Sequence, residues 1–257
     1  MFKTDNYKNK TVVITGGTKG IGLGITKAYL SLSAKVIILA RNKPKKQIQV
    51  KGNKALFYQC NVRDNANVEE VINEVFKANK CIDVLINNAG GAPLINSLDA
   101  SMNFNNAIID LNLNSSFAVS YYVAKKMIKK SSGCVITNIS SVTATRPTPG
   151  SAAYGAAKGG LVNLTKTLAV EWAPRIRVNS IITGYIETEN SLLHYGSKKD
   201  MKAVAKTIPM KRMGTPEDIA SACIFLSSVN SSWITGTAIE VHGGGESPAY
   251  LNSSKPK

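Results

Sequence analysis

Short β-branched and apolar runs alternate along the chain with longer segments of helical spacing. The runs predict buried strands, because strands covered on both faces read as continuous hydrophobic segments. We expect seven strands, at residues 11–15, 35–40, 55–59, 83–86, 133–138, 176–182 and 238–241. Between them, apolar residues three and four positions apart predict helices from residue 20 onward and over 65–78, 101–130, 154–172 and 216–226. This alternation predicts an α/β fold, a doubly wound parallel sheet of Rossmann type, with about seven strands and helices on both faces.

The chain shows no internal repeat, low-complexity segment or interdomain linker. Its 257 residues are enough to bury a full core, so we expect a single domain over residues 1–257. Residues 187–209 are polar, lysine-rich and only weakly amphipathic. We interpret this segment as a substrate lid and not as core.

A glycine-rich turn follows the first predicted strand. Glycines at this point let the backbone turn sharply, approach a pyrophosphate closely and pack the next helix against the strand, while the helix N-terminus attracts phosphate. The turn therefore predicts a dinucleotide site. Its residues are Gly16, Thr18, Lys19, Gly20, Ile21 and Gly22.

The second predicted strand ends in Ala40-Arg41, where a dinucleotide fold that prefers NAD carries an acidic residue. An arginine here suits a 2′-phosphate instead, and Lys19 in the glycine turn supplies a second cation. We therefore expect NADP(H) as the cofactor. Further lysines nearby either add positive potential or are solvated loop charges, namely Lys43, Lys45, Lys46, Lys51 and Lys54.

The formal net charge is +16, with the basic residues spread along the chain. This charge fits a solvated basic surface, or attraction to an anionic ligand such as a dinucleotide or a coenzyme A thioester. No nucleic-acid-binding module and no apolar run of membrane-spanning length occurs, and the four cysteines have no metal-site spacing. We expect a cytoplasmic protein with reduced thiols and no metal, nucleic-acid or membrane partner.

Candidate chemistry gathers between residues 138 and 158, which contain Ser141, Tyr154 and Lys158. On a helix, Tyr154 and Lys158 share a face, and a lysine beside a phenol is expected to lower the phenol pKa. The pattern Tyr-x-x-x-Lys is not specific, because it occurs four times in this lysine-rich chain. Any single copy can equally be a solvated helix face. The other three copies are Tyr121/Lys125, Tyr122/Lys126 and Tyr195/Lys199.

Taken in order, these motifs resemble those of the short-chain dehydrogenase/reductase family, and the resemblance covers nearly the whole chain. The matching residues are Thr15-Gly16-x-x-x-Gly20-x-Gly22, Asn87-Asn88-Ala89-Gly90, Asn112, Ser141, Tyr154-x-x-x-Lys158 and Arg177-Val178-Asn179-Ser180. Only the Tyr154 copy follows a serine at the interval that this family uses.

The resemblance implies a role for each matching residue. Tyr154 is the expected acid for carbonyl reduction and base for alcohol oxidation, while Ser141 polarises the substrate oxygen. Lys158 is expected to bind the nicotinamide ribose, and Asn112 to hold a water that links Lys158 to solvent. Tyr154 and Lys158 thus count as cofactor contacts too. The other contacts implied by the resemblance are Asn61, Val62, Asn88, Ala89, Gly90, Gly184, Ile186 and Thr188.

Three positions depart from the family pattern. Thr183 replaces a proline, which is expected to loosen the loop on the nicotinamide side. His242 replaces an aspartate near the C-terminus, which puts the role of that aspartate in subunit contact in doubt. Val170 replaces an arginine common in carrier-protein reductases, which argues against an acyl-carrier-protein partner. A hydrolase-like triad of Ser141 with His242 or His194 is an alternative interpretation.

We therefore expect an NADP(H)-dependent oxidoreductase that interconverts a ketone and a secondary alcohol. Its substrate is a small molecule, either a 3-oxoacyl thioester or another hydroxy or keto metabolite. Arg146 and the lid lysines Lys198, Lys199 and Lys202 either favour an anionic thioester or are solvated surface. By resemblance the assembly is a homotetramer. The alternative from another class is a catalytically silent, dinucleotide-binding regulator or scaffold.

Overall fold

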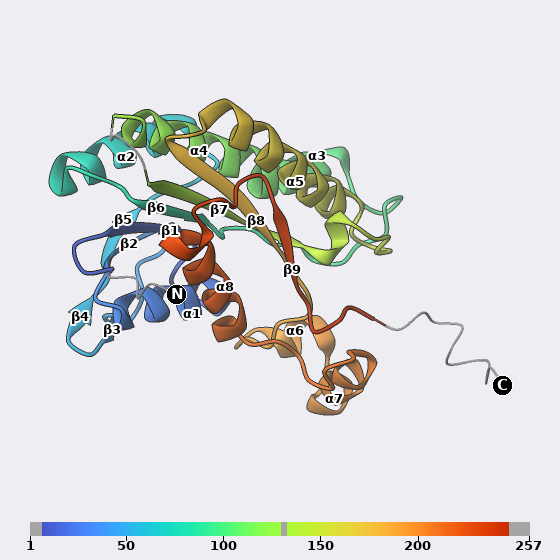
Figure 1. Cartoon of the computed structure of the whole chain (residues 1–257). Helices are drawn as coiled ribbons and strands as arrows, with labels where there is room; N and C mark the ends of the chain where they lie inside the picture. Colours follow the sequence, from blue (N-terminus) through green and yellow to red (C-terminus); the bar gives the residue numbers. More distant parts are fainter. Residues whose placement is uncertain (1–6, 130–132, 247–257) are drawn as a thin grey trace.

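The computed structural model describes residues 7–129 and 133–246. Its centre is one sheet in which all seven strands run parallel, in the order β5-β2-β1-β6-β7-β8-β9. The predicted sheet is therefore confirmed (Figure 1). The strands are β1 (Thr11–Thr15), β2 (Lys35–Ala40), β5 (Leu56–Gln59), β6 (Val84–Asn87), β7 (Cys134–Ser141), β8 (Ile176–Thr183) and β9 (Ala238–Val241).

The strand order reverses direction beside β1. From β1 the chain builds outward through β2 to β5, and it then returns to the other side of β1 and continues through β6 to β9. Val12 lies between Val36 of β2 and Val84 of β6 in the register. In open parallel sheets, ligands bind outside the carboxyl ends of the strands at such a reversal point. The topology thus directs attention to the turns after β1 and β6.

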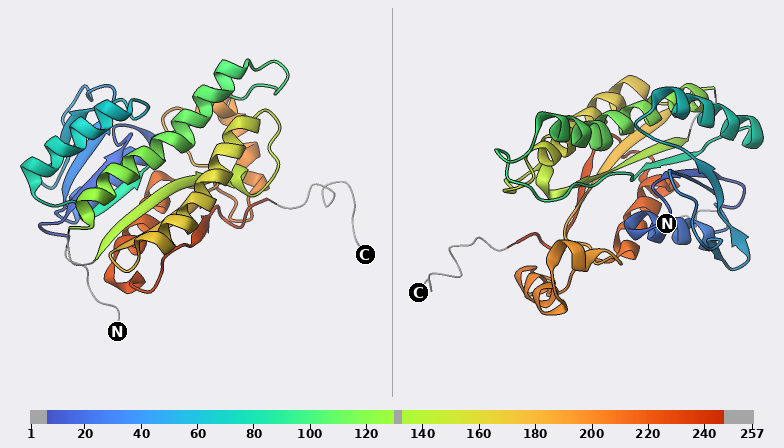
Figure 2. Two further views of the ribbon diagram at one scale, coloured as in Figure 1. Left: turned by 90° about the horizontal axis from the view of Figure 1, so that it is seen from above. Right: turned by 180° about the vertical axis from the view of Figure 1, so that it is seen from behind.

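Helices cover both faces of the sheet, as expected (Figures 1 and 2). Residues of α2, α4 and α5 pack in one apolar cluster with Val13 and Ile136, and residues of α1 and α8 pack in another with Ile14 and Ile139. Neighbouring residues of one strand serve opposite clusters because their side chains alternate. The helices are α1 (Gly20–Ser31), α2 (Asn65–Asn79), α3 (Met102–Ile109), α4 (Ser115–Met127), α5 (Ala152–Trp172) and α8 (Pro216–Ser227).

The segment expected as one helix over 101–130 contains a distortion that its apolar spacing did not predict. A π-helical turn, Asp110–Asn114, separates α3 from α4 and contains Asn112. The preceding helix begins where the Ser101 side chain accepts a hydrogen bond from the Phe104 N–H. Residues 130–132 lie outside the described part of the chain, so the predicted end at 130 is not described. Single π turns inside helices are frequent at functional sites.

Residues 187–209 form two short helices beyond the edge of the sheet, α6 (Ser191–Tyr195) and α7 (Lys198–Thr207) (Figure 1). Ser197 and Asp200 start α7 with a capping box, in which each side chain bonds the backbone N–H of the other. No residue of α7 is buried, whereas Ile208 directly after it is 2% exposed. The segment is thus attached to the core at its end and not along its length.

The sequence reading missed a small hairpin, β3 (Gln49–Val50) with β4 (Asn53–Lys54). Two 3-10 turns, Val142–Ala144 and Val229–Ser231, complete the described elements. Two residues of the last matching motif, Arg177 and Asn179, donate hydrogen bonds to backbone carbonyls at the end of α8 and in the connection to β9, including that of Ile234. In this structure the motif therefore ties the last strand to the sheet.

No helix among the described residues is long and apolar enough to cross a bilayer.

Candidate active site

A large hollow opens where the carboxyl ends of the parallel strands meet. Its walls come from the segments that follow β1, β2, β5, β6, β7 and β8, together with α7 and Glu246. The strand reversal beside β1 therefore lies under its floor, as the topology requires. The hollow has a half over β2, β1 and β6, called here the cofactor half, and a half over β7 and β8, called the substrate half.

The glycine turn forms the base of the cofactor half. Gly16 and Gly20 have φ of 67° and 53°, a left-handed conformation that strains residues with a Cβ. A Cβ on Gly22 would lie 2.3 Å from the Gly16 carbonyl oxygen, so this crossing also needs glycine. The Asn88 amide donates to the Thr15 and Gly16 carbonyl oxygens, at 3.0 and 3.2 Å. The turn after β6 thereby holds the turn after β1 in place.

An acidic side chain occupies the N-terminus of α1. The Glu189 carboxylate accepts a hydrogen bond of 2.8 Å from the Gly20 N–H. This oxygen stands where a phosphate oxygen of a dinucleotide would bind, at a free N–H that carries the positive end of the helix dipole. The structure thus holds an anion at the predicted phosphate site, and the residues present fit a dinucleotide. Glu189 itself was not predicted.

Positively charged side chains of the glycine turn and of the loop after β2 line the cofactor half. Lys19 and Arg41 line the same hollow, as the NADP(H) prediction requires, and both are exposed. Three further lysines of the loop after β2 line it as well. Within residues 7–129 and 133–246, none of these five groups forms a salt bridge. The three lysines are Lys43, Lys45 and Lys46.

The remaining predicted cofactor contacts are distributed around this region. Thr18, Ile21, Val62, Ala89, Gly90, Gly184, Ile186 and Thr188 line the hollow. Asn61 does not line the hollow. Its side-chain Oδ1 accepts from the Arg63 N–H, and its backbone N–H donates to the Asn67 Oδ1. Thr183 lies in β8, and its hydroxyl donates to the Ser140 carbonyl at 3.0 Å. The looser loop expected after this residue stays a prediction.

Ser141, Tyr154 and Lys158 come together in the substrate half. Ser141 ends β7, while the other two lie one turn apart on α5. The Tyr154 phenol hydrogen-bonds the Ser141 side chain, and the Lys158 Nζ lies 5.6 Å from the centre of the Tyr154 ring. Lys158 is 3% exposed and donates to the Ile139 carbonyl at 2.8 Å. A hydroxyl pair and a buried amine thus line one wall.

Burial governs the protonation of these groups in the protein alone. It raises the pKa of Tyr154, although the hydrogen bond from Ser141 opposes this rise. The expected lowering of the Tyr154 pKa by the lysine is therefore wrong for the protein alone. Burial also lowers the pKa of Lys158 to about 8, because the charged ammonium is poorly solvated. Lys158 can thus exchange protons close to neutral pH.

Asn112 lies next to Lys158 and is completely buried. Its side chain accepts from the Gly91 N–H at 2.8 Å and donates to the Gly91 and Ile108 carbonyls. A Cβ on Gly90 would lie 2.6 Å from the Asn112 Oδ1 and 3.2 Å from the Lys158 Nζ. Both polar groups therefore meet at Gly90, and the π-helical turn of Asn112 is fixed to the loop after β6.

The two histidines do not form a triad with Ser141. His242 pairs through Nε2 with the Glu240 carboxylate at 2.8 Å, while His194 lies in the hollow at 6.3 Å from the Tyr195 ring. The described side-chain hydrogen bonds of Ser141 go to the Thr143 N–H and to Tyr154. This arrangement gives a hydroxyl pair suited to a carbonyl oxygen and no activated serine nucleophile.

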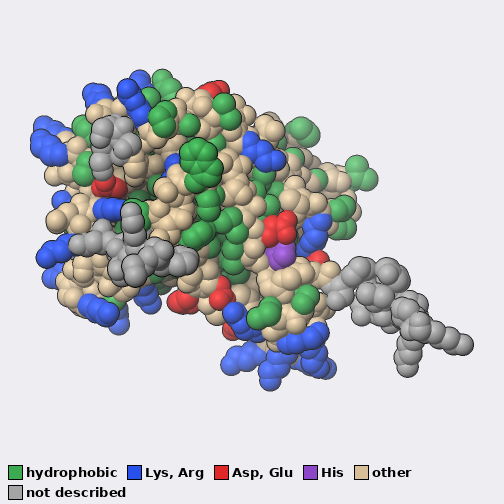
Figure 3. Space-filling view, in the orientation of Figure 1, with side chains coloured by type: hydrophobic (Ala, Val, Ile, Leu, Met, Phe, Trp, Pro, Cys, Tyr) green, Lys and Arg blue, Asp and Glu red, His purple; other side chains and the backbone are tan. Residues whose placement is uncertain are grey.

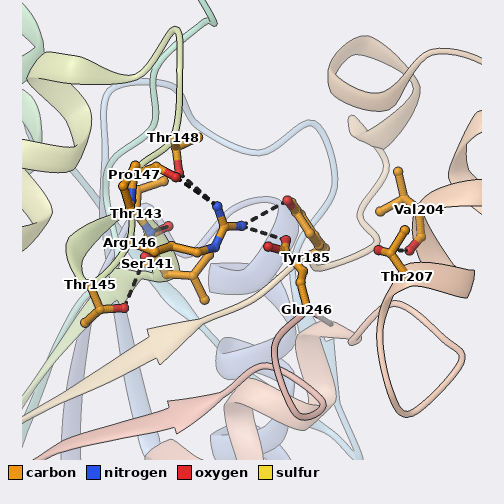
Figure 4. A network of polar contacts seen from close by, with 11 residues as sticks. Ser141, Thr143, Thr145, Arg146, Pro147, Thr148, Tyr185, Val204, Thr207 and Glu246 are labelled. Atoms are coloured by element: carbon orange, nitrogen blue, oxygen red, sulfur yellow. Dashed lines mark hydrogen bonds and ion pairs between the residues drawn. The ribbon is translucent and has the colours of Figure 1, made fainter. Parts of the chain in front are cut away.

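The substrate half also contains a network that the sequence did not predict. Arg146 donates to the Tyr185 hydroxyl at 3.0 Å and to the Glu246 carboxylate at 2.7 Å (Figure 4). The two partners lie 39 and 100 residues away from Arg146 in the chain. No spacing pattern encodes such a contact.

The lid lysines do not face the substrate. Helix α7 lines the hollow with Ala203, Val204 and Thr207. Lys198, Lys199 and Lys202 are exposed and absent from the lining, and basic side chains crowd the outer surface at the bottom of Figure 3. The interpretation of these lysines as solvated surface is the one that the structure favours.

Comparisons with known proteins agree with this architecture. A family model described as enoyl-(acyl carrier protein) reductase matches residues 16–246. A 3-oxoacyl-[acyl-carrier-protein] reductase of Chlamydia pneumoniae is 36% identical over 91% of this chain and 96% of its own length.

Two solved structures are similar over almost their whole length. The ligand-free aldohexose dehydrogenase of Thermoplasma acidophilum has a TM-score of 0.89 and 32% identity, with 98% of each chain covered. A short chain dehydrogenase of Bacillus anthracis has a TM-score of 0.84 and 34% identity, covering 95% of this chain and 99% of that one. These relatives carry enzyme names, so the alternative of a silent scaffold finds no support among them. With its seven-stranded sheet and its ordered motifs, the chain belongs to the short-chain dehydrogenase/reductase family of oxidoreductases.

Proposed function

We propose that the protein uses NADP(H) to interconvert a ketone and a secondary alcohol. The observation that carries this proposal is the meeting of Ser141, Tyr154 and Lys158 in one hollow with a glycine turn that holds a carboxylate. NADP(H) held in the cofactor half would supply the hydride, and Ser141 and Tyr154 would hold the carbonyl oxygen of the substrate. Glu189 would leave the Gly20 N–H to a cofactor phosphate.

The hydroxyl pair supplies the acid-base chemistry in this proposal. Ser141 donates a hydrogen bond to the carbonyl oxygen, and Tyr154 transfers its phenolic proton to that oxygen as the alcohol forms. In the oxidative direction Tyr154 accepts the proton. The high pKa of Tyr154 in the protein alone keeps this proton in place until a substrate is bound.

Lys158 and Asn112 complete the proposed machinery. Lys158 binds the nicotinamide ribose and returns a proton to Tyr154, which its pKa of about 8 permits at physiological pH. Asn112, fixed by Gly91 and Ile108, holds a water that connects Lys158 to solvent. Positioned proton transfer of this kind contributes roughly 10²–10⁴-fold to a rate.

The preference for NADP(H) rests on charge. The 2′-phosphate of NADPH adds about two negative charges, and Lys19 and Arg41 line the end of the hollow that would receive it. Because neither has an acidic partner within the described residues, a phosphate meets no competing carboxylate there. Arg41 can bind it through two parallel hydrogen bonds, which is the geometry that guanidinium groups favour.

The remaining proposals concern the substrate, the lid and the assembly. Two of the similar proteins are named a 3-oxoacyl-[acyl-carrier-protein] reductase and an aldohexose dehydrogenase, so we infer a hydroxy or keto compound as the substrate of this chain. Residues 187–209 act as a lid, because α7 lines the hollow without a buried residue of its own.

Exposed apolar side chains on α4 and α5, Phe117 and Val170, support association of copies into a homotetramer.

The chemistry is tested by Tyr154→Phe, which removes only the phenolic hydroxyl. NADPH oxidation is followed at 340 nm over a panel of 3-ketoacyl thioesters, sugars and simple ketones. The expected loss in kcat is about 10²–10⁴-fold with an unchanged Kd for NADPH. Tyr121→Phe is the matched control, because Lys125 lies over that ring at 5.1 Å much as Lys158 lies over Tyr154. An unchanged kcat in Tyr154→Phe would contradict the mechanism.

A further inference from the structure

Arg146 is the only arginine of the described residues that lines the substrate half, and four hydrogen bonds hold its guanidinium (Figure 4). The NH1 group donates to the Pro147 carbonyl and the Thr148 hydroxyl at 3.3 and 3.1 Å. The NH2 group donates to Tyr185 and Glu246. The donors that a guanidinium presents at its two terminal nitrogens are thus all engaged by the protein.

Three separate segments supply this cluster. Arg146 follows β7, Tyr185 follows β8, and Glu246 comes after the last strand. The Tyr185 ring packs edge to face on Tyr195, with 5.8 Å between ring centres. Burial, with smaller contributions from the nearby Tyr185 and Tyr154, raises the pKa of Tyr195 to about 12.

The cluster contains one positive and one negative side chain, whereas the described cations of the cofactor half have no acidic partner. Arg146 and Glu246 are 2.7 Å apart with side chains 31% and 29% exposed, so their charges cancel close to the substrate. An incoming carboxylate or phosphate would have to displace Glu246 or lie beside its negative charge. The lid adds no positive charge, because α7 lines the hollow with Ala203, Val204 and Thr207.

A neutral hydroxyl group meets no such obstacle. A carboxylate accepts up to about four hydrogen bonds, and the described contacts of Glu246 are those to Arg146 and Tyr185. Its remaining lone pairs can accept from a substrate hydroxyl. The Thr148 hydroxyl accepts from Arg146 and can still donate its own proton to a substrate oxygen, whereas the Tyr185 proton is engaged by Glu246.

We propose that the Arg146–Glu246 pair is a specificity-determining element that selects neutral, hydroxyl-bearing carbonyl substrates and disfavours anionic ones. Arg146 orients the Glu246 carboxylate and cancels its charge, and Glu246 in turn denies the guanidinium to an anion. The inference rests on the proposed function and names the substrate class for that same site. It contradicts an anionic thioester as the preferred substrate.

The test uses three ketones of the same size class that differ at one end. These are 4-hydroxy-2-butanone, methyl acetoacetate and acetoacetate, which carry a hydroxyl, a neutral ester and a carboxylate. In the wild-type protein with saturating NADPH, we expect kcat/KM for the hydroxyketone to exceed that for acetoacetate at least tenfold. Methyl acetoacetate should lie between them, because it is neutral and lacks the hydroxyl.

Glu246→Gln keeps the shape of the side chain and removes its charge. The freed Arg146 cation should raise kcat/KM for acetoacetate relative to the hydroxyketone at least tenfold. The double variant Arg146→Gln/Glu246→Gln removes both charges and should return this ratio toward the wild-type value. Glu240→Gln is the matched control, since that carboxylate pairs with His242 and lies outside the lining. It should leave the ratio unchanged.

The inference is overturned if wild-type protein prefers acetoacetate, or if Glu246→Gln fails to shift the ratio while activity persists. Absence of any NADPH oxidation, with all three ketones and the wider panel, would instead count against the proposed function. In that case the inference is tested by binding of the two corresponding alcohols, measured as the change in Tm that each causes. If 3-hydroxybutyrate raises the Tm of the wild-type NADPH complex more than 1,3-butanediol does, the inference is overturned. If 1,3-butanediol raises the Tm more in the wild type, and 3-hydroxybutyrate raises it more in Glu246→Gln, the inference is supported.

Discussion

The two halves of the hollow recognise their ligands by different means. The cofactor half is built largely from backbone, with glycines at 16, 20 and 22, a free helix N-terminus, and cations that lack acidic partners within the described residues. The substrate half is built from side chains on three segments, and its Arg146 cation is neutralised by Glu246. Apart from the buried Lys158, the cations of the hollow that lack an acidic partner among the described residues therefore lie in the cofactor half. The four predictions below alter the cofactor half or the boundary between the halves.

The largest effect is expected for Gly22→Ala. The new Cβ would lie 2.3 Å from the Gly16 carbonyl oxygen and 2.5 Å from the Asn88 amide, so the phosphate turn has to shift. We expect NADPH binding to weaken at least about a hundredfold, together with a lower Tm. Isothermal titration and thermal unfolding measure both quantities.

Gly159→Ala is the matched control for this change. Its Cβ would lie 3.5 Å from the Ala144 carbonyl oxygen, an ordinary contact on helix α5. Alanine in a helix is favoured over glycine by roughly 0.5–1 kcal/mol, so an unchanged or slightly higher Tm is expected. Equal losses in the two variants would show that the glycine turn has no special requirement.

Lys158→Met tests the boundary between the halves. The folded-state pKa of Lys158 is lowered from 10.5 to about 8 by burial, so the charged lysine costs stability below pH 8. This cost amounts to about 3 kcal/mol at most and disappears as the pH rises toward 10.5, where the unfolded chain also loses its proton. The variant avoids this free-energy cost of burying a charge, but it loses the hydrogen bond from Lys158 to the Ile139 carbonyl.

Urea unfolding of wild-type and Lys158→Met protein without cofactor, from pH 7 to 9.5, measures this difference. The free energy of unfolding of the variant relative to the wild type should fall steadily as the pH rises through 8 and above. A difference that does not vary with pH would mean that Lys158 titrates normally. The comparison removes the background of the other basic groups, because both proteins share them.

Arg41→Ala removes one cation from the cofactor half. Loss of a charge-assisted hydrogen bond to the 2′-phosphate should raise the Kd for NADPH about tenfold and leave the Kd for NADH unchanged. Lys199→Ala, on the outer side of α7, is the control that removes an equal charge without touching the hollow. A similar loss of NADPH affinity in both variants would indicate a general effect of net charge.

Glu189→Gln should have the smallest effect and the opposite sign. Its carboxylate competes for the Gly20 N–H and repels a phosphate, whereas an amide competes less. We expect both NADPH and NADH to bind a few-fold more tightly, since the pyrophosphate is common to both. Fluorescence titration of each cofactor measures this. Weaker binding of both would mean that Glu189 contacts the cofactor favourably.

The cofactor half was accessible from sequence, and the reason is physical. Continuous apolar runs identify buried parallel strands, and glycines mark the turns where backbone itself contacts a ligand. The strands and the turn from Gly16 to Gly22 were therefore predictable, whereas the joint position of Ser141, Tyr154 and Lys158 followed from the resemblance to the family. Element ends differed by a few residues, as with β7, which extends from Cys134 to Ser141.

Contacts between distant segments, in either half, could not be predicted in this way. The ion pair of Arg146 with Glu246 and the contact of Glu189 with Gly20 join residues 100 and 169 positions apart, which no local pattern records. The π-helical turn at Asn112 leaves apolar spacing almost unchanged. The direction of the lid lysines depends on how α7 packs, and the burial that raises the Tyr154 pKa depends on the finished fold.

The most direct test of the contrast between the halves is the pair of dissociation constants of wild-type protein for NADPH and NADH, measured over increasing salt. The two cofactors differ only in the 2′-phosphate, so their ratio isolates the unpaired cations of the cofactor half. We predict that NADPH binds at least about tenfold more tightly at low salt, and that the ratio narrows as salt screens these charges. NADH binding at least as tightly as NADPH at low salt would contradict the account.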